Sequence, residues 1–156
     1  MSSLRAAVLL ATTVTTGLMA GIYLAFGIAV MPGLSATDDR TFVLAMRSIN
    51  TKILNGWFAL VFGGPILLGL LALVLVLVAD RRAALPWLVV GVVLYAATLA
   101  VTIAVNVPLN DRLDTASQIS AARKAFEDRW IAWNIVRTVL AVGSFGALLG
   151  ALRALP

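Results

Sequence analysis

The feature that most constrains this chain is a set of four apolar runs, each long enough to cross a lipid bilayer. They are Ala6–Met31, Gly56–Ala79, Ala83–Val107 and Ile131–Leu152. A helix needs roughly 20 apolar residues to span the hydrocarbon core. Inside that core an isolated segment satisfies all its backbone N–H and C=O groups only as a helix. The sequence therefore predicts an all-α integral membrane protein, a four-helix transmembrane bundle that forms a single domain over residues 1–156.

The composition supports this prediction. Of the 156 residues, 62% are hydrophobic and 12% are charged, whereas a soluble domain has about 45–50% apolar residues. The surplus must face membrane lipid. The first apolar run is longer than the hydrophobic region of a signal peptide, so we expect it to be retained as a helix of a multi-pass protein.

The chain contains no His and no Cys. That excludes His-ligated haem, the usual zinc sites, the iron site built from two His and one carboxylate, and every His-based catalytic triad. We expect no metal site and no cofactor. The net charge of +5 comes from basic residues beside the spans, where attraction to anionic lipid explains them. We therefore expect no nucleic-acid partner.

Two long polar connections, loop 1 (residues 32–55) and loop 3 (residues 108–130), lie across the membrane from the termini and from the short turn at residues 80–82. Both show capping residues and helical spacing of apolar residues. We expect each to form a short amphipathic helix at the interface or to extend the next span. The prolines after Met31 and Val107 should kink or end the first and third spans. The loop charges leave the orientation of the termini open.

Arg137 is a charge inside the fourth apolar run, where it costs roughly 2.5 to 3.5 kcal/mol. One face of the helix carries four residues at helical spacing, namely Trp130, Trp133, Asn134 and Arg137. We expect Arg137 to stack over Trp133 one turn earlier. Its expected partners are loop carboxylates, first Asp111 and Asp114, then Asp38 and Asp39. In the alternative interpretation the Trp residues are interfacial anchors and the Arg reaches to the membrane surface.

Five asparagines gather at the membrane face of loops 1 and 3: Asn50, Asn55, Asn106, Asn110 and Asn134. An amide without a partner in hydrocarbon costs several kcal/mol. The cluster therefore indicates either a polar pocket or hydrogen bonds within and between helices. Tyr23 and Tyr95 lie mid-span and need partners for their hydroxyl groups.

Several short motifs follow one another along nearly the whole chain. They are Val30-Met31-Pro32-Gly33-Leu34, Ile49-Asn50, Asn55-Gly56-Trp57-Phe58, Asn106-Val107-Pro108-Leu109-Asn110 and Trp130-x-x-Trp133-Asn134-x-x-Arg137-Thr138. With these motifs the chain resembles the anthrone-oxygenase-like family of small four-helix integral membrane proteins. The resemblance implies a membrane-embedded, cofactor-free oxygenase that converts a lipophilic, anthrone-like aromatic to a quinone with dioxygen. We expect a multi-pass protein of a bacterial plasma membrane.

Such chemistry needs a base, donors for an oxyanion and an apolar pocket for flat rings. The candidate catalytic residues are Arg137, Asp111, Asp114 and Asn134. Asp111 or Asp114 would be the base, and Arg137 with Asn134 and Asn106 would hold the oxyanion. The candidate substrate-binding residues are Asn50, Asn55, Tyr95, Asn106, Asn110, Trp130 and Trp133. Two alternatives stay open: a protein that binds or transports a small lipophilic ligand or ion, as a homo-oligomer because four spans are few, and a structural subunit.

Overall fold

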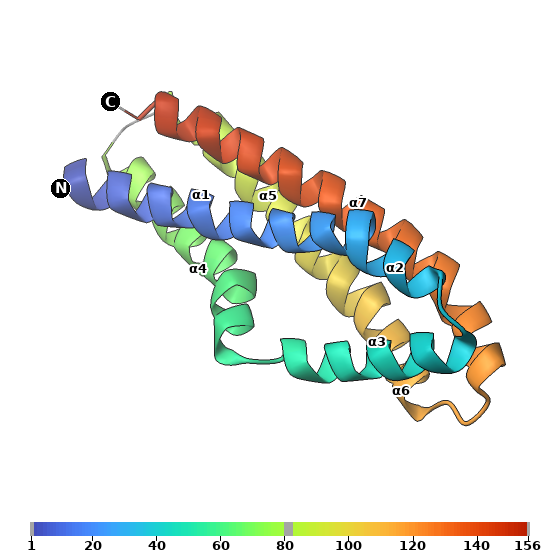
Figure 1. Cartoon of the computed structure of the whole chain (residues 1–156). Helices are drawn as coiled ribbons and strands as arrows, with labels where there is room; N and C mark the ends of the chain where they lie inside the picture. Colours follow the sequence, from blue (N-terminus) through green and yellow to red (C-terminus); the bar gives the residue numbers. More distant parts are fainter. Residues whose placement is uncertain (1, 80–82, 156) are drawn as a thin grey trace.

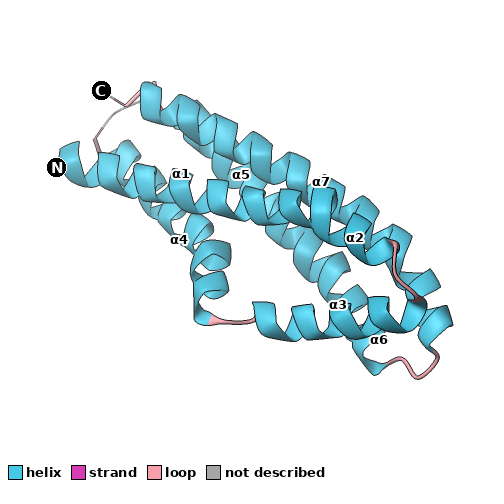
Figure 2. Ribbon diagram, viewed as in Figure 1, coloured by secondary structure: helices cyan, strands magenta, loops and turns pink. Residues whose placement is uncertain are grey.

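The computed structural model describes residues 2–79 and 83–155, and this part of the chain contains helices and no strands, as Figure 2 shows. In chain order the elements are α1 (Ser2–Ala25), η1 (Phe26–Val30), α2 (Met31–Ser35), α3 (Asp39–Ile53), α4 (Gly56–Val78), α5 (Leu85–Val101), η2 (Thr102–Asn106), α6 (Val107–Thr115) and α7 (Ile119–Arg153). Four continuous helical stretches are long and apolar enough to cross a membrane: Ser3–Ser35, Gly56–Val78, Leu85–Thr115 and Ile119–Arg153. The predicted all-α, multi-pass membrane fold is confirmed.

The four spans pack side by side as a bundle. Helix α1 contacts α4 and α7, and α5 contacts the same two helices from the other side. Both termini lie at one end of the bundle (Figure 1), as an even number of spans predicts. The predicted turn at Asp80, Arg81 and Arg82 lies outside the described residues. Large apolar side chains such as Leu67, Val78 and Val139 are exposed on the outer faces, where lipid would cover them.

The first and third spans each contain a π-helical turn shortly before a proline. In each, the N–H of the residue after the π-helix donates to the carbonyl of its first residue, as Val107 does to Thr102. Pro32 and Pro108 follow in the second position of the next α-helix. Because a π-turn spaces donor and acceptor by one more residue, the chain continues as a helix through a proline that would otherwise break it. The spans therefore do not end at Met31 and Val107, and run on through α2 and α6.

Each half of the chain has two spans, and the second spans of the two halves, α4 and α7, begin differently. In the second half α7 is one uninterrupted helix, so the amphipathic segment of loop 3 is an extension of the span. In the first half the helix breaks between Ile53 and Gly56, and α3 turns across the end of the bundle as a separate interfacial helix (Figure 1). Asn55 stabilises both sides of the break. Its side-chain oxygen accepts from the Phe58 N–H at 3.1 Å and its nitrogen donates to the Lys52 carbonyl at 3.0 Å.

Helix α3 covers the loop end of the bundle with a buried apolar face. The cluster comprises Met31, Phe42, Val43, Met46, Leu109, Leu113, Phe126 and Trp130. Asp38 caps the helix by accepting from the N–H groups of Arg40 and Thr41 at 3.0 and 3.1 Å. The Thr41 hydroxyl and these N–H groups hold the pKa of Asp38 below its usual range. This cap is therefore fully present at neutral pH and is lost as the pH falls through that lowered pKa.

At this end of the bundle, two arginines each bind the end of a helix from the other half of the chain. Arg47 on α3 donates to the carbonyls of Leu113 and Ala116, at the end of α6, over 2.6 to 3.0 Å. Arg123 on α7 donates to the carbonyl of Ser35, at the end of α2, over 2.9 Å. Each arginine thus satisfies carbonyl groups that a helix end leaves without an intrahelical partner.

Replacing Arg47 should loosen the loop end of the bundle. An Arg47→Gln change removes charged donors from two carbonyls, and we expect it to lower the free energy of unfolding by about 1 to 3 kcal/mol. Thermal unfolding of the purified protein in a neutral detergent would measure the effect as a lower midpoint. The matched control is Arg40→Gln on the same helix, since Arg40 is exposed. Equal midpoints for the two variants would contradict the role of Arg47.

Candidate functional site

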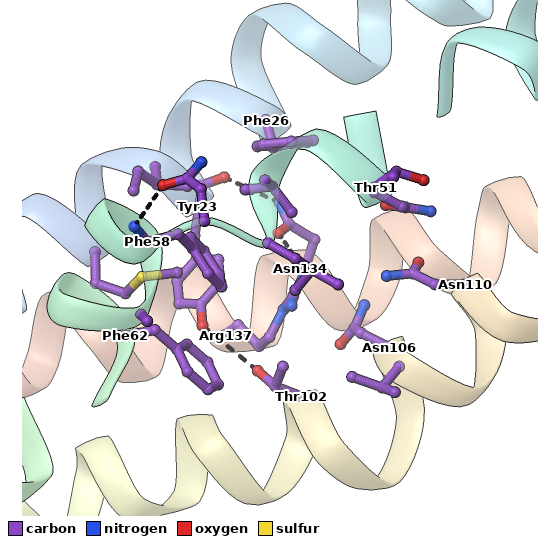
Figure 3. Close-up of a pocket in the computed structure, with 18 of the residues that line it drawn as sticks. Tyr23, Phe26, Thr51, Phe58, Phe62, Thr102, Asn106, Asn110, Asn134 and Arg137 are labelled. Carbon is purple, nitrogen blue, oxygen red and sulfur yellow. Dashed lines mark hydrogen bonds between the residues drawn. The ribbon is translucent and has the colours of Figure 1, made fainter. Parts of the chain in front are cut away.

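A cavity of about 730 Å³ lies in the angle between α3 and α4. Ligand pockets are typically about 300 to 1,000 Å³. Side chains from α1, η1, α3, α4, η2, α6 and α7 line it, and Figure 3 shows how they converge. Nine of the eleven residues proposed from the sequence are in the lining: Asn50, Asn55, Asn106, Asn110, Asp111, Asp114, Trp130, Asn134 and Arg137. Tyr95 and Trp133 are not.

Arg137 lies at the floor of the cavity and is 5% exposed. Its guanidinium carbon is 4.6 Å from the centre of the Tyr23 ring and 5.2 Å from the centre of the Trp130 ring. One terminal nitrogen, Nη2, donates to Asn134 Oδ1 at 2.9 Å. The third nitrogen of the fork, Nε, is buried without a hydrogen-bond partner. The cation therefore contacts two aromatic rings and one amide, and its buried Nε–H has no hydrogen-bond partner in the described chain.

Two expectations about Arg137 were wrong. It does not stack on Trp133, which is 37% exposed on the outer side of α7; the aromatic residue two turns away, Trp130, faces it instead. No ion pair joins Arg137 to a carboxylate among the described residues. Asp39 pairs with Arg123 at 3.2 Å, and Asp38 caps α3.

Asn134 fixes the position of the guanidinium. Its Nδ2 donates to the Tyr23 carbonyl at 3.0 Å, and its Oδ1 accepts from Arg137. Tyr23 belongs to the last turn of α1 before η1. The amide thus links α1 to α7 at the point where the Arg137 side chain enters the cavity.

Asn106 is a second residue of the lining, besides Arg137, with buried polar atoms that have no hydrogen-bond partner. Its side chain is 1% exposed, and neither Oδ1 nor Nδ2 has a partner within the described part of the chain. It lies in the lining near Arg137 (Figure 3). Leaving a buried donor or acceptor unpaired costs about 1 to 3 kcal/mol. The described chain thus supplies no hydrogen-bond partner for either end of the Asn106 amide.

Two of the other asparagines in the lining, Asn55 and Asn110, also make structural hydrogen bonds. Asn110 Oδ1 accepts from the Trp130 indole N–H at 2.9 Å and so fixes the ring that contacts Arg137. Asn55 caps the two helices at the break, as described above. Asn50 lies half-buried in the lining. Helix packing thus accounts for part of the asparagine cluster and leaves Asn106 unexplained.

Aromatic side chains from the first half of the chain complete the walls. The rings of Phe58 and Phe62 stack 5.3 Å apart, and Phe26 lies 5.6 Å from Trp130. The hydroxyl groups of Tyr23 and Thr102 are 3.4 Å apart. Phe26, Phe58 and Phe62 are apolar residues inside apolar runs, which give no signal of a site. They were therefore not among the predicted site residues. For Tyr23 the signal was present, since a mid-span hydroxyl needs a partner.

Tyr95 has a structural place next to the cavity. Its hydroxyl donates to the Phe62 carbonyl at 2.7 Å and lies 3.4 Å from the Val61 carbonyl. Pro65, four residues after Val61, lacks the N–H that a helix would offer to that carbonyl. Tyr95 thus stabilises α4 at the carbonyl groups of Val61 and Phe62.

Asp111 and Asp114 lie in the lining on the exposed side of α6. They are one turn apart, so both carboxylates are on the same face of the helix. Besides them, Arg137 is the only charged residue that lines the cavity within the described chain. The cavity therefore has a buried positive charge and an exposed negative rim.

The model of the anthrone oxygenase family matches residues 57–147, more than half of the chain. The chain belongs to the anthrone oxygenase family. The match includes Arg137, Asn106, Asn134 and the two rim aspartates, whereas Tyr23 precedes it. No curated protein and no solved structure matches the chain. The matched segment thus supplies the charged residues of the cavity and its unpaired amide, Asn106.

Two matched substitutions should separate a ligand-binding amide from a structural one. Asn106→Leu removes two unpaired buried polar atoms at similar volume, so we expect the ligand-free protein to be as stable as the wild type or more stable, by about 1 to 2 kcal/mol. Asn134→Leu breaks two hydrogen bonds and should destabilise the protein by about 1 to 3 kcal/mol. Denaturation in neutral detergent measures both. A clear loss of stability in Asn106→Leu would show that the amide has a structural partner.

Proposed function

We propose that this protein binds a lipophilic, anthrone-like aromatic in the α3–α4 cavity and oxygenates it to a quinone with dioxygen, within a bacterial plasma membrane. The observation that carries the proposal is the pair of unpaired groups at the cavity floor, Arg137 Nε and the Asn106 amide. Membership of the anthrone oxygenase family and the aromatic walls support it.

The proposed reaction needs no group beyond substrate, dioxygen and protein side chains. A base removes one proton from the methylene carbon of the anthrone, which leaves an enolate whose charge rests largely on the ketone oxygen. Dioxygen then forms a C–O bond at that carbon to give a peroxide. The remaining C–H proton leaves, the O–O bond breaks, and a second ketone and one water are formed. The substrate carbon is oxidised from methylene to carbonyl, and dioxygen is reduced to the carbonyl oxygen and water.

Arg137 and Asn106 would stabilise the enolate oxygen. A buried guanidinium that has no carboxylate partner interacts more strongly with an anion than with a neutral ketone, so it favours the charged state over the ground state. Arg137 Nε and Asn106 Nδ2 have no hydrogen-bond partner in the described chain, and in the substrate complex they would donate to this oxygen. Asn134 would act as a positioning residue, since it holds the guanidinium by a 2.9 Å hydrogen bond.

Asp111 and Asp114 are the candidates for the base. Both carboxylates reach the cavity from its exposed rim, so a proton taken from the substrate there can pass to water. A carboxylate needs hydrogen-bond reach to the acidic carbon in the substrate complex. This requirement orients the substrate with its ketone at the floor and its methylene group toward the rim.

The reaction can be tested by oxygen consumption and quinone formation with dithranol, after subtraction of the rate in protein-free detergent. We expect Arg137→Gln to lower the protein-dependent rate about a hundredfold or more, as the loss of an oxyanion donor does elsewhere. The matched control is Arg129→Gln, an exposed position on the same helix, which should keep the wild-type rate.

The outcome also distinguishes the second candidate, a protein that binds or transports a lipophilic ligand without chemistry. Saturable dithranol binding with no oxygen uptake above the protein-free rate would favour that candidate and contradict the oxygenase. Full turnover by folded Arg137→Gln would remove Arg137 from the mechanism.

A further inference from the structure

We infer that the cavity selects flat aromatic ligands with a single negative group that binds at Arg137, and that Asp111 and Asp114 disfavour ligands with a second negative group at the outer end. The inference rests on the proposed function in that it uses the same cavity. It adds a rule for the charge and the orientation of the ligand.

The floor requires a partner of negative or acceptor character. Arg137 is buried between two rings, has no carboxylate partner in the described chain, and keeps Nε unpaired. Unpaired buried charge is costly, and a counter-charge supplied by the ligand offsets that cost. Asn106 adds one free donor and one free acceptor close by (Figure 3).

The rim has the opposite sign. Asp111 and Asp114 are exposed and form no ion pair among the residues that the structure describes. Arg112 lies between the two aspartates in sequence, and Lys52 is next to the lining residue Thr51; both are exposed and do not belong to the lining. A second anionic group on the outer end of a bound ligand would therefore meet two carboxylates with no lining cation beside them.

Because the floor of the cavity is positive and its rim is negative, the two ends of a bound ligand meet opposite charges. A ligand with one anionic group gains from the floor and avoids the rim when that group points inward. A ligand with anionic groups at both ends must place one of them at the rim in either orientation. The penalty follows from like charges a few ångströms apart in a partly aqueous setting, and corresponds to roughly fivefold to tenfold in affinity.

Two anthraquinone sulfonates test this rule without any turnover, because anthraquinones have no methylene group to oxidise. One carries a single sulfonate, and the other carries one sulfonate on each outer ring. Binding to the purified full-length protein in neutral detergent can be followed by quenching of tryptophan fluorescence, since Trp130 lines the cavity. We expect the monosulfonate to bind roughly fivefold to tenfold more tightly than the disulfonate, with the difference shrinking at high salt.

Variants assign the difference to the named charges. Asp111→Asn combined with Asp114→Asn should reduce the preference to less than about twofold. The control Asp128→Asn, exposed on α7 and outside the lining, should retain the wild-type preference. Arg137→Gln should weaken monosulfonate binding by at least about tenfold.

Each alternative result has a defined meaning. An unchanged preference in the double aspartate variant would overturn the rim as the source of selectivity. Monosulfonate binding no stronger than to empty micelles would overturn the inference as a whole. Failure of dithranol oxidation alongside the expected sulfonate pattern would remove only the proposed reaction, and turnover without that pattern would remove only the charge rule.

Discussion

The structure depends on how one buried positive charge is accommodated. Arg137 is inside a membrane span, and the described chain offers it aromatic rings and an amide instead of a carboxylate. Each ring contact contributes roughly 0.5 to 2 kcal/mol, which offsets part of the desolvation of the guanidinium. The arrangement keeps the cation in place without neutralising it. If a carboxylate of the protein neutralised Arg137, a ligand anion would find no uncompensated positive charge at this position.

The cavity around this charge arises from the unequal second spans of the two halves. Helix α7 is unbroken, and it places Trp130, Asn134 and Arg137 on one continuous face. The break at Asn55 lets α3 turn across the bundle end, where it buries Phe42 and Met46. Space remains in the angle between α3 and α4, and residues of η2 also line it. The helix break therefore both closes the loop end of the bundle and leaves the cavity open.

The sequence predicted the spans and most of the charged and amide residues of the cavity, and the reason is energetic. Long apolar runs have one solution in a bilayer, and a polar side chain among them is costly enough to be informative. The sequence did not predict which groups face each other. Helical spacing places Trp130, Trp133 and Arg137 near one another on α7, but it does not indicate that Tyr23 from α1 lies against the guanidinium. The π-turns that carry the chain through Pro32 and Pro108 also leave no clear local signature, so the span ends were misplaced.

The asparagines of the cavity differ in whether their side chains have hydrogen-bond partners within the described chain. Asparagines at membrane depth are ambiguous as a class, because an amide serves equally well to cap a helix, to link two helices or to bind a ligand. Asn55, Asn110 and Asn134 have their partners within the protein. Asn106 does not, although it is as deeply buried as Asn134. The stability of the fold alone would favour an apolar residue at position 106, so the proposed ligand would give Asn106 and Arg137 the partners that the described chain does not.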